Sequence, residues 1–490
     1  MRISTSPLAV IRTAAVLAVC LTFSACRNRS DAKTTVPADR ETSVLHLPAM
    51  DLAGGKRANG AILITVDTLR ADYLSCYGHT RVLTPSFDRF SQMSVVFRNT
   101  FSQASTTTPS HSSIMTSLYL QDHNVYSNFE ALGDTPQTLA ETFKAAGYAT
   151  YAIVNMRHLN PEVGNLAQGF QHFVRSGNSR RAAASFDDLL NWIDAQQGKP
   201  FFAWVHLADV HTPYRPPPPY DRFYYDDDEH DPSETSLARI WPTLPKDMSD
   251  HPSFQAWLEG ITDVQYVLAQ YQGAVTYVDD EFGRLLDELD NRRILSRTAV
   301  ILTADHGESL GEHGMYFVHT GLYDATTHIP LITWFPGDGR HGAQVRDIVE
   351  SVDIYPTLLE YMGLTPPEGI RGRSLLPLVR GGTLAPKNAF IEHAGRNLVA
   401  IRSERYAYVR HLRTAYIQPS YTFTNGREEL YDLQSDPDEL HDISKEKPEA
   451  VALFRAELAR RRTERLDLAI GKAEVTAETT DVLRSLGYVQ

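Results

Sequence analysis

Cysteine is scarce in this sequence, and its scarcity excludes a disulfide framework. The 490 residues contain three cysteines, Cys20, Cys26 and Cys76. If Cys20 belongs to a removed signal segment and Cys26 carries lipid, Cys76 has no partner within the chain. Stability must therefore come from burial of an apolar core. A chain of this length that is 42% hydrophobic can form a large one.

Positive charge is also in short supply. The chain has 47 Lys and Arg residues against 60 Asp and Glu residues, which gives a formal net charge of −13. This composition provides no basic stripe, and we therefore expect no nucleic-acid partner. An anionic substrate would have to be attracted by charges local to its site.

Long hydrophobic runs are absent beyond the amino terminus. Residues 13–23 (TAAVLAVCLTF) are too few for a membrane span but are typical of a signal-peptide core. The sequence Phe23-Ser24-Ala25-Cys26 follows and is similar to a bacterial lipoprotein cleavage site. We predict a signal peptide over 1–25 and a flexible tether over 26–58, with plain signal cleavage or an uncleaved anchor as alternatives. The expected location is the cell envelope, as a periplasmic or outer-surface lipoprotein that contacts the membrane only through this segment.

Strand and helix patterns alternate along the rest of the chain. This alternation predicts an α/β fold with a large mixed, mainly parallel sheet sandwiched by helices. The expected strands are 61–66, 95–97, 148–154, 201–207, 298–303 and 331–335. The expected helices are 138–146, 183–196, one within 263–289, and 354–362.

Two segments depart from the alternation. Residues 213–231 contain four consecutive prolines and an acidic run, which predicts a surface loop over the mouth of the crevice. Residues 388–392 and 398–411 have alternating apolar positions, which predict a small antiparallel sheet followed by a helix within 448–466. We therefore divide the chain into a catalytic domain over 59–381 and a carboxy-terminal subdomain over 382–490 that completes the site.

Several reactive side chains follow the ends of expected strands. Asp67 follows one apolar run, and Asp305-His306 follows another far downstream. Parallel strands of an open sheet bring their carboxyl ends to one crevice. Thr107 and His111 lie around Pro109, which we expect to open a helix whose free amides favour an anion. The pattern predicts an enzyme.

These motifs resemble the sulfatase branch of the alkaline phosphatase superfamily. The matching segments are 62–72, 107–111, 305–308, 322–324 and 430–433 with Asp436-Pro437. The resemblance covers about residues 61–489. It implies the alkaline phosphatase-like fold and hydrolysis of sulfate or phosphate esters of a small molecule, a glycan or a lipid.

The chain departs from the family at the residue that defines a sulfatase. Family members present Cys-x-Pro-Ser-Arg, whose cysteine becomes formylglycine, and this chain has Thr107-Thr108-Pro109-Ser110-His111. Threonine cannot become formylglycine, but its alkoxide can attack phosphorus directly. The departure favours phosphodiester or phosphonate chemistry. A second hypothesis is a catalytically idle protein that binds an anionic glycan or lipid headgroup.

The resemblance also implies a divalent metal ion. Asp67, Asp305, His306 and Thr107 match the ligands that phosphodiesterase-like relatives offer. An imidazole ligand favours zinc, manganese or iron over calcium, which prefers oxygen.

A second metal ion is one interpretation of three further residues. Asp209, His211 and His319 form a plausible ligand set. The alternative is a single ion, with His211 and His319 contacting the substrate and the leaving group. His158 falls near a family position that faces the nucleophile. His111 replaces a family arginine, and it either orients Thr107 or binds the anion.

Overall fold

A computed structural model describes residues 58–175, 180–418 and 421–466. These residues belong to one compact unit. The predicted signal peptide and nearly all of the predicted tether lie outside the described residues, and the predicted domain boundary near residue 382 stays a prediction. No helix in the described part has both the length and the apolar composition that a membrane crossing needs.

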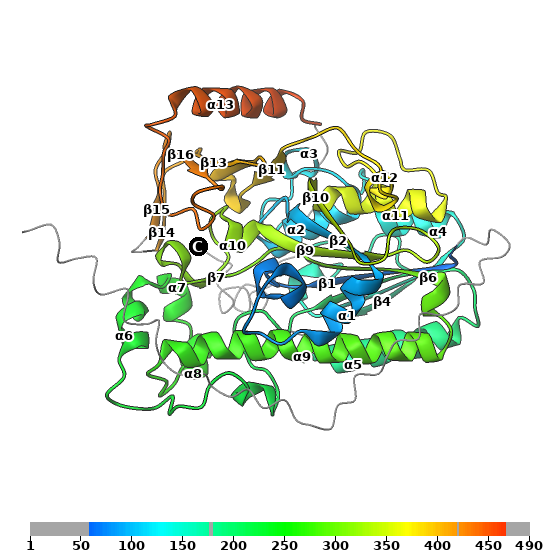
Figure 1. Cartoon of the computed structure of the whole chain (residues 1–490), viewed down its shortest axis with the longest axis horizontal. Helices are drawn as coiled ribbons and strands as arrows, with labels where there is room; N and C mark the ends of the chain where they lie inside the picture. Colours follow the sequence, from blue (N-terminus) through cyan, green and yellow to red (C-terminus); the bar gives the residue numbers. More distant parts are fainter. Residues whose placement is uncertain (1–57, 176–179, 419–420, 467–490) are drawn as a thin grey trace, which may run out of the picture. The chain divides into compact units, whose positions relative to one another are not determined.

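An eight-stranded sheet forms the centre of the fold, as predicted (Figure 1). Seven strands are parallel to one another, and β9 runs antiparallel to both of its neighbours. In spatial order the strands are β10 (Ala343–Glu350), β2 (Val95–Phe101), β9 (His328–Trp334), β6 (Thr298–Ala304), β1 (Gly60–Val66), β5 (Phe201–Leu207), β3 (Ala149–Val154) and β4 (His172–Arg175).

The central strands are buried along their whole length. Every residue of β1, β5 and β6 is buried, which explains their continuous apolar sequences. The sequence predicted six of the eight strands, with ends within a few residues. It missed β4, whose residues are half-buried or exposed, and β10, whose apolar positions are interrupted by charged residues.

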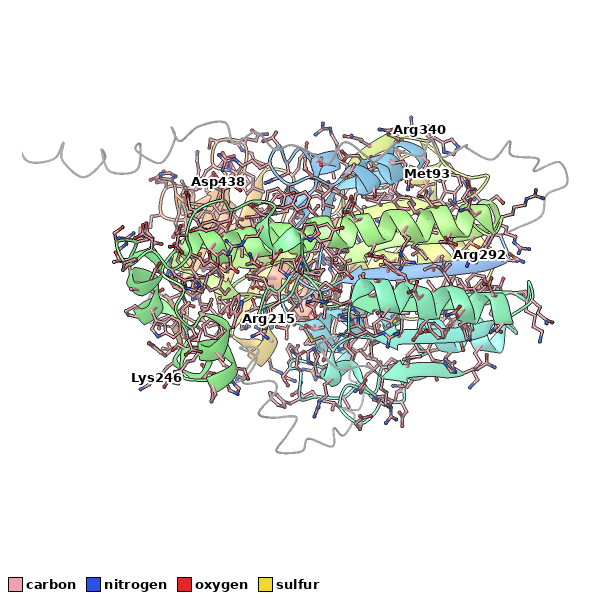
Figure 2. All side chains as sticks on the ribbon, turned by 90° about the horizontal axis from the view of Figure 1, so that it is seen from below. Met93, Arg215, Lys246, Arg292, Arg340 and Asp438 are labelled. Carbon is pink, nitrogen blue, oxygen red and sulfur yellow. The ribbon has the colours of Figure 1, made fainter. Side chains whose placement is uncertain are left out.

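Helices cover both faces of the sheet (Figure 1). One face carries α2 (Thr107–Thr116), α4 (Leu139–Ala145), α11 (Ile354–Met362) and α12 (Leu376–Val379), which share one apolar core with the strands. The other face carries α1 (Pro85–Met93), α5 (Ala182–Ala195) and the 28-residue α9 (Val264–Asn291). Figure 2 shows α5 and α9 side by side, with Arg292 just past the end of α9.

The helix α2 begins two residues earlier than the sequence predicted. We expected Pro109 to open it, but Thr107 is its first residue. Proline is tolerated throughout a first turn, because amides there have no partner within the helix. The expected free amides are consequently engaged: Ser110 donates to the carbonyl of Thr106 at 3.0 Å, and Thr108 donates to Asn128 Oδ1 at 2.8 Å.

Much of the proline-rich segment 213–231 packs along α9, and the ring of Tyr214 at its start lies 6.1 Å from the ring of Phe317. The Tyr220 hydroxyl donates to Asp280 Oδ2 at 2.6 Å, and the Tyr224 hydroxyl lies 2.6 Å from Thr276 Oγ1. These contacts fix the segment on α9, and its predicted position over the crevice mouth stays a prediction. Short helices follow it: α6 (Ser236–Ile240), α7 (Lys246–Ser249) and α8 (Pro252–Trp257).

A small antiparallel sheet lies beside the main one, as predicted. Its strands in order are β11 (Ala389–Glu392), β12 (Leu398–Arg402), β13 (Tyr406–His411) and β16 (Glu428–Asp432). The helix α13 (Pro448–Thr463) packs on it through Val451, Phe454 and Leu458. The amide of Glu392 donates to the carbonyl of Gln103 at 2.9 Å, which ties this sheet to the segment before α2.

The remaining elements are short. They are α3 (Leu120–His123), β7 (Ser309–Leu310), β8 (Tyr316–Val318), α10 (Asp324–Thr327), β14 (Ala415–Gln418) and β15 (Tyr421–Phe423).

Candidate active site

Two aspartates follow paired residues of neighbouring parallel strands. Val66 of β1 is in register with Ala304 of β6, so Asp67 and Asp305 leave the sheet side by side. Both side chains are fully buried. The strand pairing therefore places the two carboxylates at one point on the carboxyl edge of the sheet.

Thr107 and His306 converge on these carboxylates. The Thr107 hydroxyl lies 3.2 Å from His306 Nε2. The same nitrogen lies 3.5 Å from Asp305 Oδ2 and 3.6 Å from Asp67 Oδ1. One ligand atom from each of Asp67, Asp305 and His306 lies within 4.8 Å of the others. The structure thus brings together the four residues predicted to hold an ion.

The carboxylate oxygens that face this point lack hydrogen-bond partners. Both oxygens of Asp67 and Oδ2 of Asp305 are buried and accept no hydrogen bond. Oδ1 of Asp305 instead accepts from the amides of Thr68 at 3.3 Å and His306 at 2.9 Å, which fixes the carboxylate. Buried oxygens of this kind are costly without a counter-charge, and a divalent cation fits the set.

The proton affinities of the two aspartates diverge. Burial, followed by the charge of Asp305, raises the pKa of Asp67 well above its ordinary value. Burial also acts to raise the pKa of Asp305, but His306 and His111 outweigh it and lower that pKa to about 2. Two adjacent carboxylates therefore do not ionise equally unless positive charge is supplied.

His306 has the tautomer that a metal ligand needs. Its Nδ1 lies 2.9 Å from the carbonyl oxygen of Gly307, so Nδ1 carries the proton and donates it there. The lone pair of Nε2 is then directed at Thr107 and the two aspartates. A ligating histidine usually donates its other ring N–H in this way.

His111 is buried beside Asp305, with its Nδ1 3.6 Å from Asp305 Oδ2. Its Nδ1 donates to the carbonyl of Thr107 at 2.8 Å, and its Nε2 accepts from the Thr65 hydroxyl at 3.0 Å. Trp204 Nε1 donates to the same Thr65 oxygen at 3.0 Å. Burial lowers the pKa of His111 to about 3, so the ring is neutral. Both ring nitrogens are engaged, and His111 holds the first turn of α2 in place.

Two further histidines lie beside His306. The ring of His319 is 4.7 Å from that of His306, and the ring of His211 is 5.7 Å from that of His319. Glu308 Oε1 lies 3.6 Å from His319 Nδ1, and its Oε2 accepts from the Thr212 hydroxyl at 3.0 Å. Burial, then the nearby His319, lowers the pKa of His211 to about 3.

The set predicted for a second ion is not gathered. Among the described residues, no group with ligand atoms within 4.8 Å of one another combines Asp209, His211 and His319. Asp209 instead lies 3.8 Å from Arg181 Nη1, and burial raises its pKa to about 7. The loop after β5 directs Asp209 toward the start of α5, while His211 stays near His319.

His158 is buried beside α2. Its carbonyl accepts from the Thr108 hydroxyl at 3.4 Å. Burial, followed by His206 and His211, lowers the pKa of its ring well below the ordinary value. The residue is therefore a neutral neighbour of the site.

Sequence reasoning missed two residues at this site. His206, in the middle of β5, has its Nε2 3.4 Å from Asp67 Oδ2. Glu308 was noted within a motif without a role. A histidine in an otherwise apolar buried strand is a signal that could have indicated the first, because a polar ring needs a partner there.

The fold and the site define the class of protein. An open, mainly parallel sheet carries a buried Thr, Asp and His cluster at its carboxyl edge, where sheets of this kind bind their ligands. The family model described as Sulfatase matches residues 60–364, and the model of the N-sulphoglucosamine sulphohydrolase carboxy-terminal region matches 311–464. The chain belongs to the sulfatase family, and it is a sulfuric or phosphoric ester hydrolase.

Known proteins similar to this chain are distant in sequence. An arylsulfatase of Clostridium perfringens is 24% identical to this chain. The similarity covers 78% of this chain and 89% of that protein. The multifunctional alkaline phosphatase superfamily protein PehA of Trinickia caryophylli is 24% identical to this chain. The similarity covers 80% of this chain and 92% of PehA. The solved phosphonate monoester hydrolase of Agrobacterium radiobacter has a TM-score of 0.67 at 23% identity, covering 86% and 98% of the two chains, and shows the shared fold.

Proposed function

We propose that this protein is a metal-dependent hydrolase of phosphodiesters or phosphonate esters that uses Thr107 as its nucleophile. One observation carries the proposal: the Thr107 hydroxyl lies 3.2 Å from His306 Nε2, where Asp67 and Asp305 converge. A hydroxyl at the junction of two carboxylates and an imidazole lone pair suits activation by an ion.

The charge of the site supports the need for a cation. Three buried carboxylates, those of Asp67, Asp305 and Glu308, surround the position where an anionic ester must bind. Arg70 is the cation nearest to Asp67 in sequence, and its guanidinium is engaged by Asp72 and Glu312 at 2.7 Å each. The bare site would repel a phosphate ester.

We propose one divalent ion, held by Asp67, Asp305, His306 and the Thr107 hydroxyl. Zinc, manganese and iron suit the imidazole ligand better than calcium does. When bound, such an ion lowers the pKa of a coordinated hydroxyl and polarises an ester oxygen.

Thr107 would carry out the reaction in two steps, through an ester of its own hydroxyl. The Thr107 hydroxyl loses its proton as Oγ1 forms a bond to phosphorus, the bond from phosphorus to the leaving oxygen breaks, and that oxygen takes up one proton. The oxygen of a water molecule then bonds to phosphorus, the bond from phosphorus to Oγ1 breaks, and one proton of the water restores the Thr107 hydroxyl. His319 and His211 extend from His306 on one side of the nucleophile, which suits contact with the substrate and its leaving group.

Sulfate esters are the less favoured substrates in this proposal. A formylglycine hydrate releases sulfate by returning to the aldehyde, and threonine has no such route. The names of two similar proteins, the phosphonate monoester hydrolase and the multifunctional PehA, agree with a substrate range that includes phosphorus.

The test combines metal analysis with a substrate comparison. Elemental analysis of the purified chain should find about one transition-metal ion per molecule, and chelation should abolish turnover. Initial rates on 4-nitrophenyl esters should be highest for the phosphodiester or phosphonate and lowest for the sulfate. The reverse order contradicts the proposed chemistry, and a metal-free chain without turnover supports an idle binding protein.

Substitution of Thr107 tests the nucleophile. T107A should lower kcat on the preferred ester by at least about 10³-fold, because the attacking oxygen is removed. T107S keeps that oxygen and should retain most of the activity. T116A, at the other end of α2, is the matched control and should leave kcat unchanged. Equal rates for T107A and T116A would exclude Thr107 as the nucleophile.

We further propose that the protein works in the cell envelope as a lipoprotein anchored at Cys26, on a glycan, lipid or small-molecule ester. The short apolar segment and Phe23-Ser24-Ala25-Cys26 support the anchor.

A further inference from the structure

His206 is a polar residue inside a fully buried parallel strand. All seven residues of β5 are buried, and the strand lies between β1 and β3 in the middle of the sheet. An imidazole in this position costs free energy unless its ring nitrogens find partners. The partners of His206 therefore indicate why the strand contains it.

One nitrogen of His206 is engaged by the backbone of the neighbouring strand. Val154 of β3 is in register with His206, and the amide of the next residue, Asn155, donates to His206 Nδ1 at 3.4 Å. A nitrogen that accepts a hydrogen bond carries no proton. In the neutral ring the proton is therefore on Nε2.

The other nitrogen faces a carboxylate of the candidate metal site. Nε2 lies 3.4 Å from Asp67 Oδ2. Both atoms are buried, and among the described residues neither makes a hydrogen bond, with the other or with any further group. Nε2 can therefore serve as the donor and Oδ2 as the acceptor of a hydrogen bond, since the distance between them permits one.

Packing holds the His206 ring at this angle. The ring of His111 crosses it at 66° with 5.0 Å between centroids, and the Trp204 ring lies 6.4 Å away at 75°. His111 is itself fixed by Thr107 and Thr65. The ring therefore has little freedom to turn away from Asp67.

We propose that His206 is a positioning residue that donates its Nε2 proton to Asp67 Oδ2 and so presents Oδ1 of Asp67 to the ion. Oδ1 is the oxygen that lies 3.6 Å from His306 Nε2. The inference rests on the metal site of the proposed function. Potential ligand atoms of His111, His206 and Asp305 also lie within 4.8 Å of one another, and the inference gives each of these residues a role. The two histidines of that cluster support neighbouring groups and do not ligate.

Two substitutions separate this role from a merely structural one. H206F keeps an aromatic ring and removes the donor, whereas H206Q can place an amide N–H near the position of Nε2. Competition with a chromogenic chelator, using zinc and manganese as probes, measures the affinity of the full chain for each metal. H206F should bind each ion 10- to 100-fold more weakly, as loss of a hydrogen bond to a ligand does. H206Q should stay within about threefold of the unsubstituted chain.

The reference variants distinguish the outcomes. D67N should lose more affinity than H206F, because it alters a ligand. If H206F binds metal as tightly as the unsubstituted chain, the positioning role is wrong while the metal site stands. If H206Q binds as poorly as D67N, His206 is a ligand and the inference is overturned. If the unsubstituted chain binds no metal, the proposed function fails and this inference fails with it.

A measurement on the unsubstituted chain, with H206Q used only for assignment, keeps the inference testable if H206F does not fold. In the metal-free chain labelled with ¹⁵N-histidine, the His206 resonances, identified by their loss in H206Q, should show a proton on Nε2 and none on Nδ1. A proton on Nδ1 would overturn the inference.

Discussion

Thr107 and His111 show what a single residue contributes to this site. The sequence located Thr107 as a potential nucleophile, and the structure places its hydroxyl beside the carboxylates. For His111 the sequence left two roles open. The ring bonds to the Thr107 carbonyl and to Thr65, which favours the role of orienting Thr107, and its Nδ1 also lies 3.6 Å from Asp305 Oδ2. Thr65 lies in a distant part of the sequence, so the sequence could not indicate this contact.

Because Glu392 is buried, we predict that the stability of the protein depends on pH. Burial raises its pKa to about 7, with the Gln121 amide and the Tyr126 hydroxyl bonded to its oxygens. A carboxyl with a raised pKa in the folded state stabilises the fold below its unfolded pKa, and this contribution is lost as pH rises through about 7. We expect the free energy of unfolding to fall between pH 5 and 8 by up to about 3 kcal/mol from this group.

The variant E392Q provides the measurement. Glutamine resembles the protonated acid, so urea unfolding of E392Q should show a flatter dependence on pH and a greater stability than the unsubstituted chain at pH 8. Parallel pH profiles for the two chains would contradict the assignment.

At the scale of elements, buried strands and long amphipathic helices were the most predictable. The predicted helix at 354–362 has the bounds of α11, and the predicted strand at 201–207 has those of β5. Each has a strong local pattern that tertiary packing does not override. The predicted start of α2 was wrong, because proline marks a first turn without specifying its first residue.

Gly273 of α9 lies directly under the proline-rich segment, so substitution of this glycine tests how firmly the segment packs on the helix. A Cβ added there would lie 2.2 Å from the carbonyl oxygen of Tyr220 and 3.2 Å from Pro216 Cγ. Alanine in place of a helical glycine normally stabilises by about 1 kcal/mol. Here we expect G273A to destabilise the protein by about 1–3 kcal/mol, because the proline-rich segment must move.

Chemical denaturation and limited proteolysis within 213–231 measure this effect. Q272A, at the adjacent half-buried position, is the control and should change stability little. A more stable G273A would show that the segment moves aside without cost.

The whole molecule combines an acidic chain with a site that must bind an anion. The net charge of −13 offers no general attraction, and the buried carboxylates of the site add local repulsion. A cation bound between Asp67 and Asp305 would supply the positive charge that an anionic ester needs there. The small sheet bonds to the segment before α2 through Glu392 and Gln103, so residues far apart in the sequence meet close to Thr107.

Cys26 predicts the location of the whole molecule. If it carries lipid, the full chain should fractionate with membranes, and C26S should move most of it to the soluble fraction, because one or more acyl chains provide the attachment. Cell fractionation with immunodetection measures this, and C76S is the matched control because Cys76 lies within the fold. Retention of C26S in the membrane fraction would favour an uncleaved anchor.

The sequence by itself determined the class of the fold, the family and the residue types available for chemistry. It did so because buried parallel strands and strand-end motifs are local patterns. Only the tertiary structure decided which group each nitrogen of His206 faces and that Asp209 lies beside Arg181. Those facts depend on distances between residues far apart in the chain, and only packing sets such distances.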